Sequence, residues 1–247
     1  MPFNDGDIIL VEYSLFIKET NELVDTTNES VAKLHGKYSE DEVYEPEVMV
    51  VGEGRFIPGV EEAIKNAEVG KEYEVEIPPE KGYGERDPSK VKVFPRRMFI
   101  KNNITPEVGK EVKINNMTGR IIAVGGGRVT VDFNHPLAGK TLLFKFKVLK
   151  KIEDLIEKVK YLIKRRAKRI QLDEIKVEHD PQEGKVTVEL PEEMRLADGV
   201  QLLKFLAARD ITKWVPEIKV VVYVEKYSKE DFGGGASSER GEQEKTA

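Results

Sequence analysis

The sequence contains no cysteine among its 247 residues. That absence excludes a disulfide framework, a thiol nucleophile and a zinc site with cysteine ligands, and it is consistent with a reducing cytoplasm. Histidine is also scarce, because only His35, His135 and His179 are present, and they lie far apart in the chain. Nothing in this composition requires a cofactor.

Long apolar runs are missing as well, because charged residues interrupt each of them well before the length that crosses a membrane. Residues 1–7 have neither the basic nor the apolar segment of a signal peptide. Charged residues make up 34% of the chain and the net charge is −5, so the chain as a whole has no attraction to nucleic acid or lipid. We expect a soluble cytoplasmic protein without a membrane partner.

The chain is longer than one ordinary domain. Its first part indicates antiparallel strands around one short helix. Residues 7–20 are rich in β-branched and aromatic side chains and lead through a turn into a second strand that ends at Asp25. A third strand is expected at 48–51, a helix at 60–67 and another strand at 72–77.

From residue 85 the pattern changes to short β-like pieces separated by turn residues. These pieces cover residues 91–94, 111–114, 119–124 and 128–132. A strand at 141–149 then resumes the first pattern. The sequence therefore predicts that residues 85–133 form a small all-β unit inserted into the first domain.

A separate α+β domain is expected over residues 152–227. Its first helix is indicated by apolar residues at helical spacing, among them Leu155, Val159 and Leu162. The elements expected after it are strands at 171–178 and 185–190, a helix at 191–208 and a strand at 217–227. Residues 228–247 contain almost nothing apolar and are predicted to be disordered.

Four segments in a fixed order carry a resemblance to a known family. They are Val11-Glu12-Tyr13 with Leu23-Val24-Asp25, VVGEGRFIPGVEEA at 50–63, PEKGYG at 79–84 and LAGKTLLF at 137–144. Together they resemble the FKBP family of peptidyl-prolyl cis-trans isomerases. The interruption after Gly84, resumed at Asn134, is similar to the SlyD-like branch, which carries an inserted chaperone domain there. The added C-terminal domain is similar to the long archaeal FKBPs.

The resemblance implies an α+β protein, with an FKBP-type antiparallel sheet wrapped on a short helix. That domain is discontinuous and consists of residues 1–84 and 134–151. Residues 85–133 would be the inserted chaperone (insert-in-flap) domain, and residues 152–227 the C-terminal α+β domain. The partners implied are unfolded or nascent polypeptides.

The resemblance also places a proline pocket. It assigns a catalytic role to Tyr13, Asp25, Ile57, Tyr83 and Phe144. It assigns substrate binding to Val24, Met49, Phe56 and Val60. Val60 stands where many members have a tryptophan, and Val24 where they often have a phenylalanine. These two departures imply a wider pocket, and they weaken the case for macrolide binding more than the case for isomerase activity.

Such a pocket requires no nucleophile. Resonance in the peptide bond opposes rotation by roughly 18–20 kcal/mol, and a twisted amide has lost the associated charge separation. An apolar pocket that accepts the twisted form should therefore lower the barrier. The Tyr83 hydroxyl and, by resemblance, the backbone N–H of Ile57 would donate to substrate carbonyls, while Tyr13 and Asp25 pair beneath. Taken singly, each of these residues also reads as an ordinary core or turn residue.

In the insert, Phe94, Met98, Phe99 and Ile100 flank Pro95-Arg96-Arg97. We expect this apolar group to exceed what so small a unit buries and to bind unfolded chains. The alternative is that the same residues form the insert's own core. The histidine-rich tail of some SlyD-like proteins is missing, since residues 228–247 contain no histidine, and we predict no metal site.

Two other functions stay open. The first is an ATP-independent holdase with negligible isomerase activity. The second is an RNA-associated protein that uses residues 151–169, which hold eight basic and three acidic residues. Nucleic-acid binding is not expected, because Tyr161 is the sole aromatic side chain there for base stacking. The valine-rich strand at 218–224 favours a homodimer through the C-terminal domain.

Overall fold

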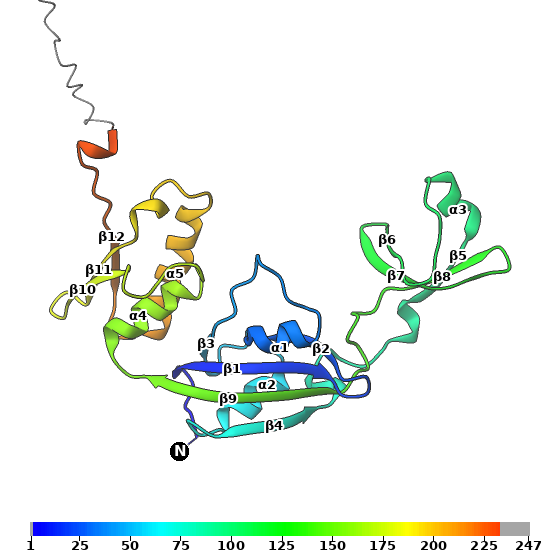
Figure 1. Ribbon diagram of the computed structural model, residues 1–247, viewed down its shortest axis with the longest axis horizontal. Helices are drawn as coiled ribbons and strands as arrows, with labels where there is room; N and C mark the ends of the chain where they lie inside the picture. The colour runs from blue at the N-terminus through cyan, green and yellow to red at the C-terminus, as the bar shows by residue number, and fades with distance from the viewer. Residues whose placement is uncertain (1, 233–247) are drawn as a thin grey trace, which may run out of the picture. The chain divides into compact units, whose positions relative to one another are not determined.

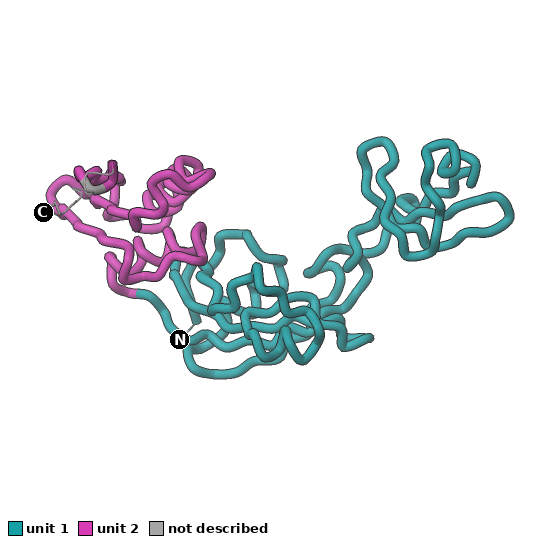
Figure 2. Tube along the Cα trace, turned by 45° about the horizontal axis from the view of Figure 1, so that its top comes forward, with its two compact units in different colours: residues 1–152 teal, residues 153–247 magenta. Residues whose placement is uncertain are grey.

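The computed structural model of the protein describes residues 2–232. The chain divides into two compact units, Met1–Ile152 and Glu153–Ala247, which Figure 2 shows in separate colours. Of the tail predicted to be disordered, residues 233–247 lie outside the described residues. Residues Glu230–Phe232 form a short 3-10 helix, η4.

A five-stranded antiparallel sheet forms the base of the first unit (Figure 1). Its strands are β1 (Ile8–Ile17), β2 (Glu22–Thr26), β3 (Glu47–Val50), β4 (Glu72–Ile77) and β9 (Leu142–Ile152). Their order is β2-β1-β9-β4, and β3 also pairs with β1. β9 pairs with β1 from Ile17↔Leu142 to Ile8↔Ile152, so the strand that follows the insert lies beside the first strand of the chain.

Helix α2 (Pro58–Lys65) packs on this sheet. Pro58 occupies its first turn, where a missing N–H costs nothing, so the helix begins two residues earlier than predicted. Val60 and Ile64 face a core that includes Ile77 and Phe144. A Cβ at Gly59 would clash with Ile77 Cγ2, so only glycine allows this close approach of helix and strand.

Helix α1 (Glu29–Leu34) lies between the predicted strands that end at Asp25 and begin at residue 48, where the sequence analysis placed no element. Asn28 begins it, because its side-chain oxygen accepts from the backbone N–H groups of Ser30 and Val31. With only Ala32 buried, six residues carry too little apolar periodicity to reveal a helix. The short 3-10 helix η1 (Pro79–Lys81) follows β4.

The insert forms a four-stranded antiparallel sheet of its own. Its strands are β5 (Val91–Pro95), β6 (Glu111–Ile114), β7 (Met117–Gly125) and β8 (Arg128–Asp132), in the order β5-β8-β7-β6. The 3-10 helix η2 (Pro88–Lys90) precedes β5. Helix α3 (Arg96–Lys101), which the sequence analysis did not predict, follows β5 and places Phe99 in the insert's core.

The second unit holds a three-stranded sheet and two longer helices. Its elements are α4 (Leu155–Lys164), β10 (Lys176–Asp180), β11 (Lys185–Glu189), η3 (Glu192–Met194), α5 (Val200–Trp214) and β12 (Val220–Tyr223). The strand order is β10-β11-β12, with β11 and β12 parallel. The helix predicted from residue 191 begins only at Val200, because Gly199 adopts a left-handed φ of 77° and separates α5 from η3. Antiparallel sheets combined with helices confirm the α+β class.

Candidate functional site

A cavity of about 250 Å³ opens on the five-stranded sheet of the first unit. Its lining comes from four strands, from α2 and the segment that leads into it, and from the loop after η1. The lining residues are Tyr13, Leu15, Asp25, Met49, Arg55, Phe56, Ile57, Val60, Tyr83 and Phe144. The structure thus gathers eight of the nine residues that the resemblance placed in the pocket.

Val24 is the exception, because it packs against the core and does not line the cavity. The β1–β2 pairing explains its place. Leu15 pairs with Asp25 and the next residue, Phe16, pairs with Leu23, so Val24 is the extra residue of a bulge. A bulge redirects side chains along a strand, and this one brings Asp25 instead of Val24 to the cavity.

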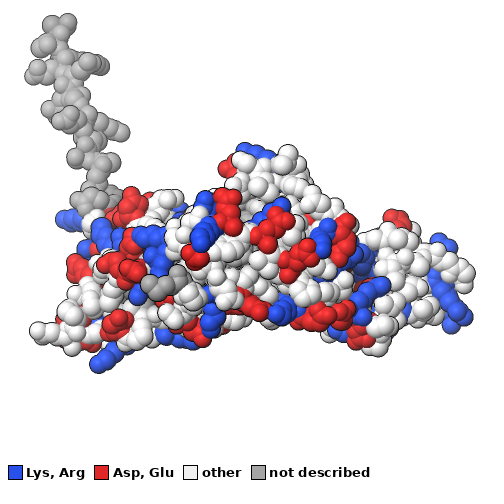
Figure 3. Space-filling model, turned by 90° about the horizontal axis from the view of Figure 1, so that it is seen from below, with Lys and Arg blue, Asp and Glu red and all other residues white. Residues whose placement is uncertain are grey.

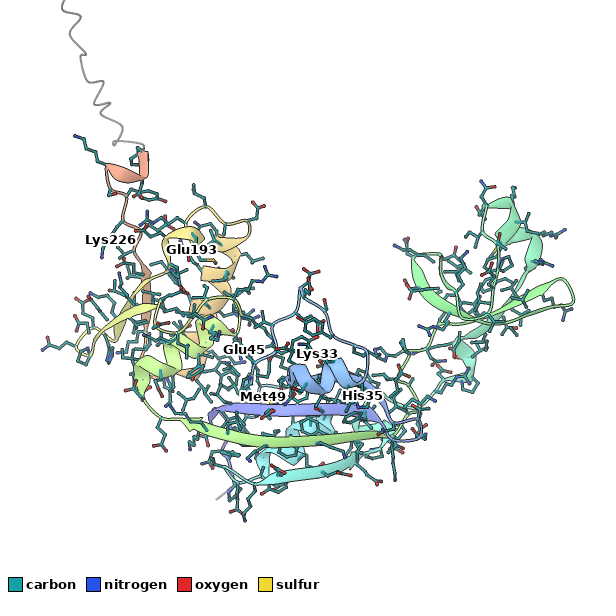
Figure 4. All side chains as sticks on the ribbon, viewed as in Figure 1. Lys33, His35, Glu45, Met49, Glu193 and Lys226 are labelled. Carbon is teal, nitrogen blue, oxygen red and sulfur yellow. The ribbon has the colours of Figure 1, made fainter. Side chains whose placement is uncertain are left out.

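Apolar side chains form the floor of the cavity. Met49, on β3 (Figure 4), Val60 and Phe144 are all buried. The Phe144 ring is stacked on Phe146 with 4.7 Å between ring centroids, and it lies 5.7 Å from the Tyr13 ring at a tilt of 47°. This packing fixes the floor, so an apolar group that enters the cavity meets a surface already in place.

Tyr13 and Asp25 form the polar side of the cavity. The Tyr13 hydroxyl donates to Asp25 Oδ2 at 2.6 Å, as predicted, and the Thr26 N–H donates to Asp25 Oδ1 at 2.9 Å. Burial, and then the negative charge of Asp25, raise the pKa of Tyr13 far above its ordinary value, so the phenol keeps its proton. Both oxygens of the carboxylate already accept hydrogen bonds, which suits an orienting role better than proton transfer.

The loop that leads into α2 is held by Glu61, which the sequence analysis did not identify. Its carboxylate accepts from the Gly52 N–H at 3.1 Å and from the Phe56 N–H at 3.3 Å. An acidic residue in the first turn of a helix is the signal that could have found it. The adjacent Ile57 N–H has no acceptor among the described residues, so it is available to a ligand in the cavity.

Arg55 and Leu15 also line the cavity, although the resemblance did not place them there. The Arg55 guanidinium lies 3.7 Å from the carboxylate of the buried Glu47. Leu15 is two residues after Tyr13 on β1, and alternation along a strand puts both side chains on the same face. The sequence pattern alone could therefore have identified Leu15.

Tyr83 lies at the rim of the cavity and is 36% exposed. Its ring is stacked on the imidazole of His135, with 4.3 Å between centroids and 4° between ring planes. The hydroxyl has no hydrogen-bond partner among residues 2–232. It is therefore available to a ligand at the mouth of the cavity.

The four predicted binding residues of the insert do not share one environment. Phe99 is 1% exposed and belongs to the insert's core, contrary to the expectation that it binds clients, whereas Ile100 is 59% exposed. Phe94 and Met98 are partly buried against that core. The helical turn of α3 explains the split, because consecutive residues of a helix point about 100° apart.

Within the part of the chain that the structure describes, no three potential metal-ligating side chains gather into one group. No helix over residues 2–232 is both long and apolar enough to cross a bilayer.

Known proteins match different parts of this chain. A family model described as "FKBP26, IF domain" matches residues 92–137, and one described as "FKBP26_C-terminal" matches residues 156–228. The "Short-type peptidyl-prolyl cis-trans isomerase" of Methanocaldococcus jannaschii is 42% identical over 143 residues, which cover 58% of this chain and 90% of that protein.

Two bacterial relatives extend the comparison. The "Probable FKBP-type 16 kDa peptidyl-prolyl cis-trans isomerase" of Pseudomonas fluorescens is 35% identical over 42% of this chain and 71% of its own length. The "FKBP-type peptidyl-prolyl cis-trans isomerase SlyD" of Helicobacter pylori is 38% identical over 42% of this chain and 58% of its own length. This chain therefore belongs to the family of FKBP-type peptidyl-prolyl cis-trans isomerases.

Proposed function

We propose that this chain catalyses the cis/trans isomerisation of X-Pro peptide bonds in the cavity on its five-stranded sheet, and that its insert holds unfolded polypeptide during the reaction. The observation that carries the proposal is a fixed apolar floor with unused donors at the mouth. Met49, Val60 and Phe144 supply the floor, and the Ile57 N–H and the Tyr83 hydroxyl supply the donors.

The size of the cavity favours a small apolar group. About 250 Å³ is below the usual range of roughly 300–1,000 Å³ for sites that enclose drug-sized ligands. A proline ring with part of its peptide is a better match for such a cavity than a macrolide. Because Val60 is small, the larger side chains of Phe144 and Met49 supply most of the apolar floor.

The reaction then needs no covalent step. Twisting the X-Pro bond removes its charge separation, and an apolar floor favours the twisted form over the planar one. Donors at Ile57 and Tyr83 would hold the flanking carbonyls, which fixes one end of the peptide while the other rotates. Each reduction of the barrier by 1.36 kcal/mol raises the rate about tenfold.

Tyr83→Phe is expected to lower kcat/KM for a short X-Pro peptide by about threefold to tenfold, the effect of losing one neutral hydrogen bond. The measurement is the rate of cis-to-trans conversion of the peptide with each variant. Tyr38→Phe is the matched control, because Tyr38 is also exposed but does not line the cavity. Equal rates for Tyr83→Phe and wild type would contradict the proposal that the Tyr83 hydroxyl donates a hydrogen bond to the substrate. No acceleration by folded wild type would contradict the isomerase proposal and favour the holdase.

The insert's surface supports the holding role. Its core of five buried residues is small. Several apolar side chains remain exposed, namely Val93, Ile100, Val108, Met117 and Ile122. Flexible and branched apolar side chains at a surface adapt to many partners, which suits unfolded polypeptide of varied sequence.

The basic residues in 151–169, the stretch that contains α4, give less support to RNA binding than their number suggested. Arg165 is buried and donates to Asp210 Oδ2 at 2.7 Å, and Arg166 donates to the same oxygen at 2.9 Å. Although burial opposes ionisation, these bonds hold the pKa of Asp210 below its ordinary value. The Lys164 ammonium donates to the backbone oxygens of Lys168 and Ile170. On the face drawn in Figure 3, basic and acidic side chains are interspersed.

We also propose that two copies of the chain pair through their C-terminal domains. β12 lies at the edge of its sheet among the described residues, and Val220 and Val222 are exposed on it. An open apolar edge can pair with its own copy about a twofold axis.

Light scattering at micromolar concentration is expected to give about twice the chain mass of 28.0 kDa. Val220→Lys with Val222→Lys should return the mass to that of one chain, because charges repel across such an edge. Val93→Lys, on the insert, is the control and should not change the mass. A single-chain mass for the wild type would contradict the dimer.

A further inference from the structure

The stacked pair of Tyr83 and His135 connects the segment that leads into the insert with the segment that leads out of it. Tyr83 comes just before the chain enters the insert, and His135 comes just after it returns. The Gly139 N–H donates to the Gly84 oxygen at 2.8 Å, which ties the two segments together beside the stack. Only Tyr83 of the pair lines the cavity.

The imidazole of His135 is held in place by its own turn. Its Nδ1 accepts from the Leu137 N–H at 3.1 Å, and its backbone oxygen accepts from the Ala138 N–H at 2.9 Å. The preceding residue, Asn134, exchanges two hydrogen bonds with the backbone of Asp87 on the outgoing segment. His135 therefore stands on a turn that is fixed from both sides.

Tyr83 has no comparable support. Its hydroxyl makes no hydrogen bond within the described residues, and its side chain is partly exposed. The flat contact with His135, at 4.3 Å and 4°, is the aromatic contact that this ring makes among the described residues. A donor at the rim is useful only if it is held where the substrate carbonyl will lie.

We propose that His135 is a positioning residue for Tyr83 and that the stack holds the phenol at the mouth of the cavity. This inference rests on the proposed isomerase function. It assigns His135 no contact with substrate, because the residue does not line the cavity. An aromatic stack contributes enough to change the rate by about threefold to tenfold.

Two substitutions separate the stack from the turn. His135→Asn keeps a side-chain oxygen that can accept from the Leu137 N–H, as in an Asx turn, but removes the ring. His135→Phe removes the acceptor but keeps a flat ring over Tyr83. If the stack matters, kcat/KM for a short X-Pro peptide falls by about threefold to tenfold in His135→Asn and stays near wild type in His135→Phe.

The same substitutions are repeated in a Tyr83→Ala background, where His135→Asn is expected to have no further effect. His35→Ala is the matched control, because its ring also contacts an aromatic side chain, Phe16 at 5.3 Å, outside the cavity. Equal loss in both backgrounds, or full activity of His135→Asn, would overturn the positioning role. Failure of wild type to accelerate the reaction would instead overturn the proposed function, so the two failures are distinguishable.

Discussion

Replacing residues 85–133 by a short glycine-serine linker is expected to leave isomerisation of a short X-Pro peptide within about threefold of wild type. The same deletion should make the protein more than about tenfold less effective at accelerating the proline-limited refolding of an unfolded client. A loss of about 1.4 kcal/mol in client affinity is enough for a tenfold effect. The reason for the first result is that every residue lining the cavity lies outside the deleted segment. The insert also has its own core, so its removal leaves the other core intact.

The ends of the deletion are suited to this test. The hydrogen bond from Gly139 to Gly84 keeps the two segments adjacent, and Tyr83 and His135 are both retained in the shortened chain. The retained chain loses the two hydrogen bonds between Asn134 and the backbone of Asp87, which are one of the two supports of the His135 turn. Asn134, Asp87 and His135 do not line the cavity, so we expect the loss to stay within the threefold limit.

The two leading functions give opposite results in this experiment. An isomerase that recruits clients through its insert keeps its activity on peptides and loses it on proteins. A holdase without turnover has no peptide activity in either form. Val93→Ser with Ile100→Ser is a milder version, because both side chains are exposed and their loss leaves the insert's core in place. Unchanged refolding of client protein by both variants would contradict a holding role for the insert.

The site was more predictable from the sequence than the details of the fold. Short segments with glycine, proline and aromatic residues in a fixed order contain seven of the predicted cavity residues, and the eighth, Met49, directly precedes one of these segments. Val24 was misplaced because a β-bulge depends on how two strands pair, and no local pattern records that pairing. Arg55 was missed because a lone arginine in a loop reads as a solvated charge.

Short helices were the main limit of the sequence analysis. α1 and α3 have six residues each, too few to show a helical period against their surroundings. Missing helix α3 led to a wrong assignment of client-binding residues. Phe99 and Ile100 appear as one apolar group in the sequence, but in the helix Phe99 lies in the core and Ile100 on the surface. In the second unit, α5 begins later than predicted because Gly199 ends the preceding turn.

Phe144→Ala is expected to have the largest effect of any single substitution in the cavity. Phe144 is 2% exposed on β9, between Leu15 of β1 and Val75 of β4, and its ring is stacked on Phe146. Removing a buried phenylalanine ring destabilises a core by about 3–5 kcal/mol. The midpoint of urea unfolding should fall accordingly.

The same substitution removes most of the floor against which a proline ring would pack. Burial of one apolar side chain contributes about 1.5–3 kcal/mol, so kcat/KM for a short X-Pro peptide should fall roughly tenfold to hundredfold under conditions where the variant is folded. Phe16→Ala separates the two effects, because Phe16 is buried on the same sheet but outside the cavity. It should lose stability and keep its activity, whereas Phe144→Leu should recover part of both. Wild-type turnover by folded Phe144→Ala would show that isomerisation occurs elsewhere, since no substrate that depends on this floor could tolerate its loss.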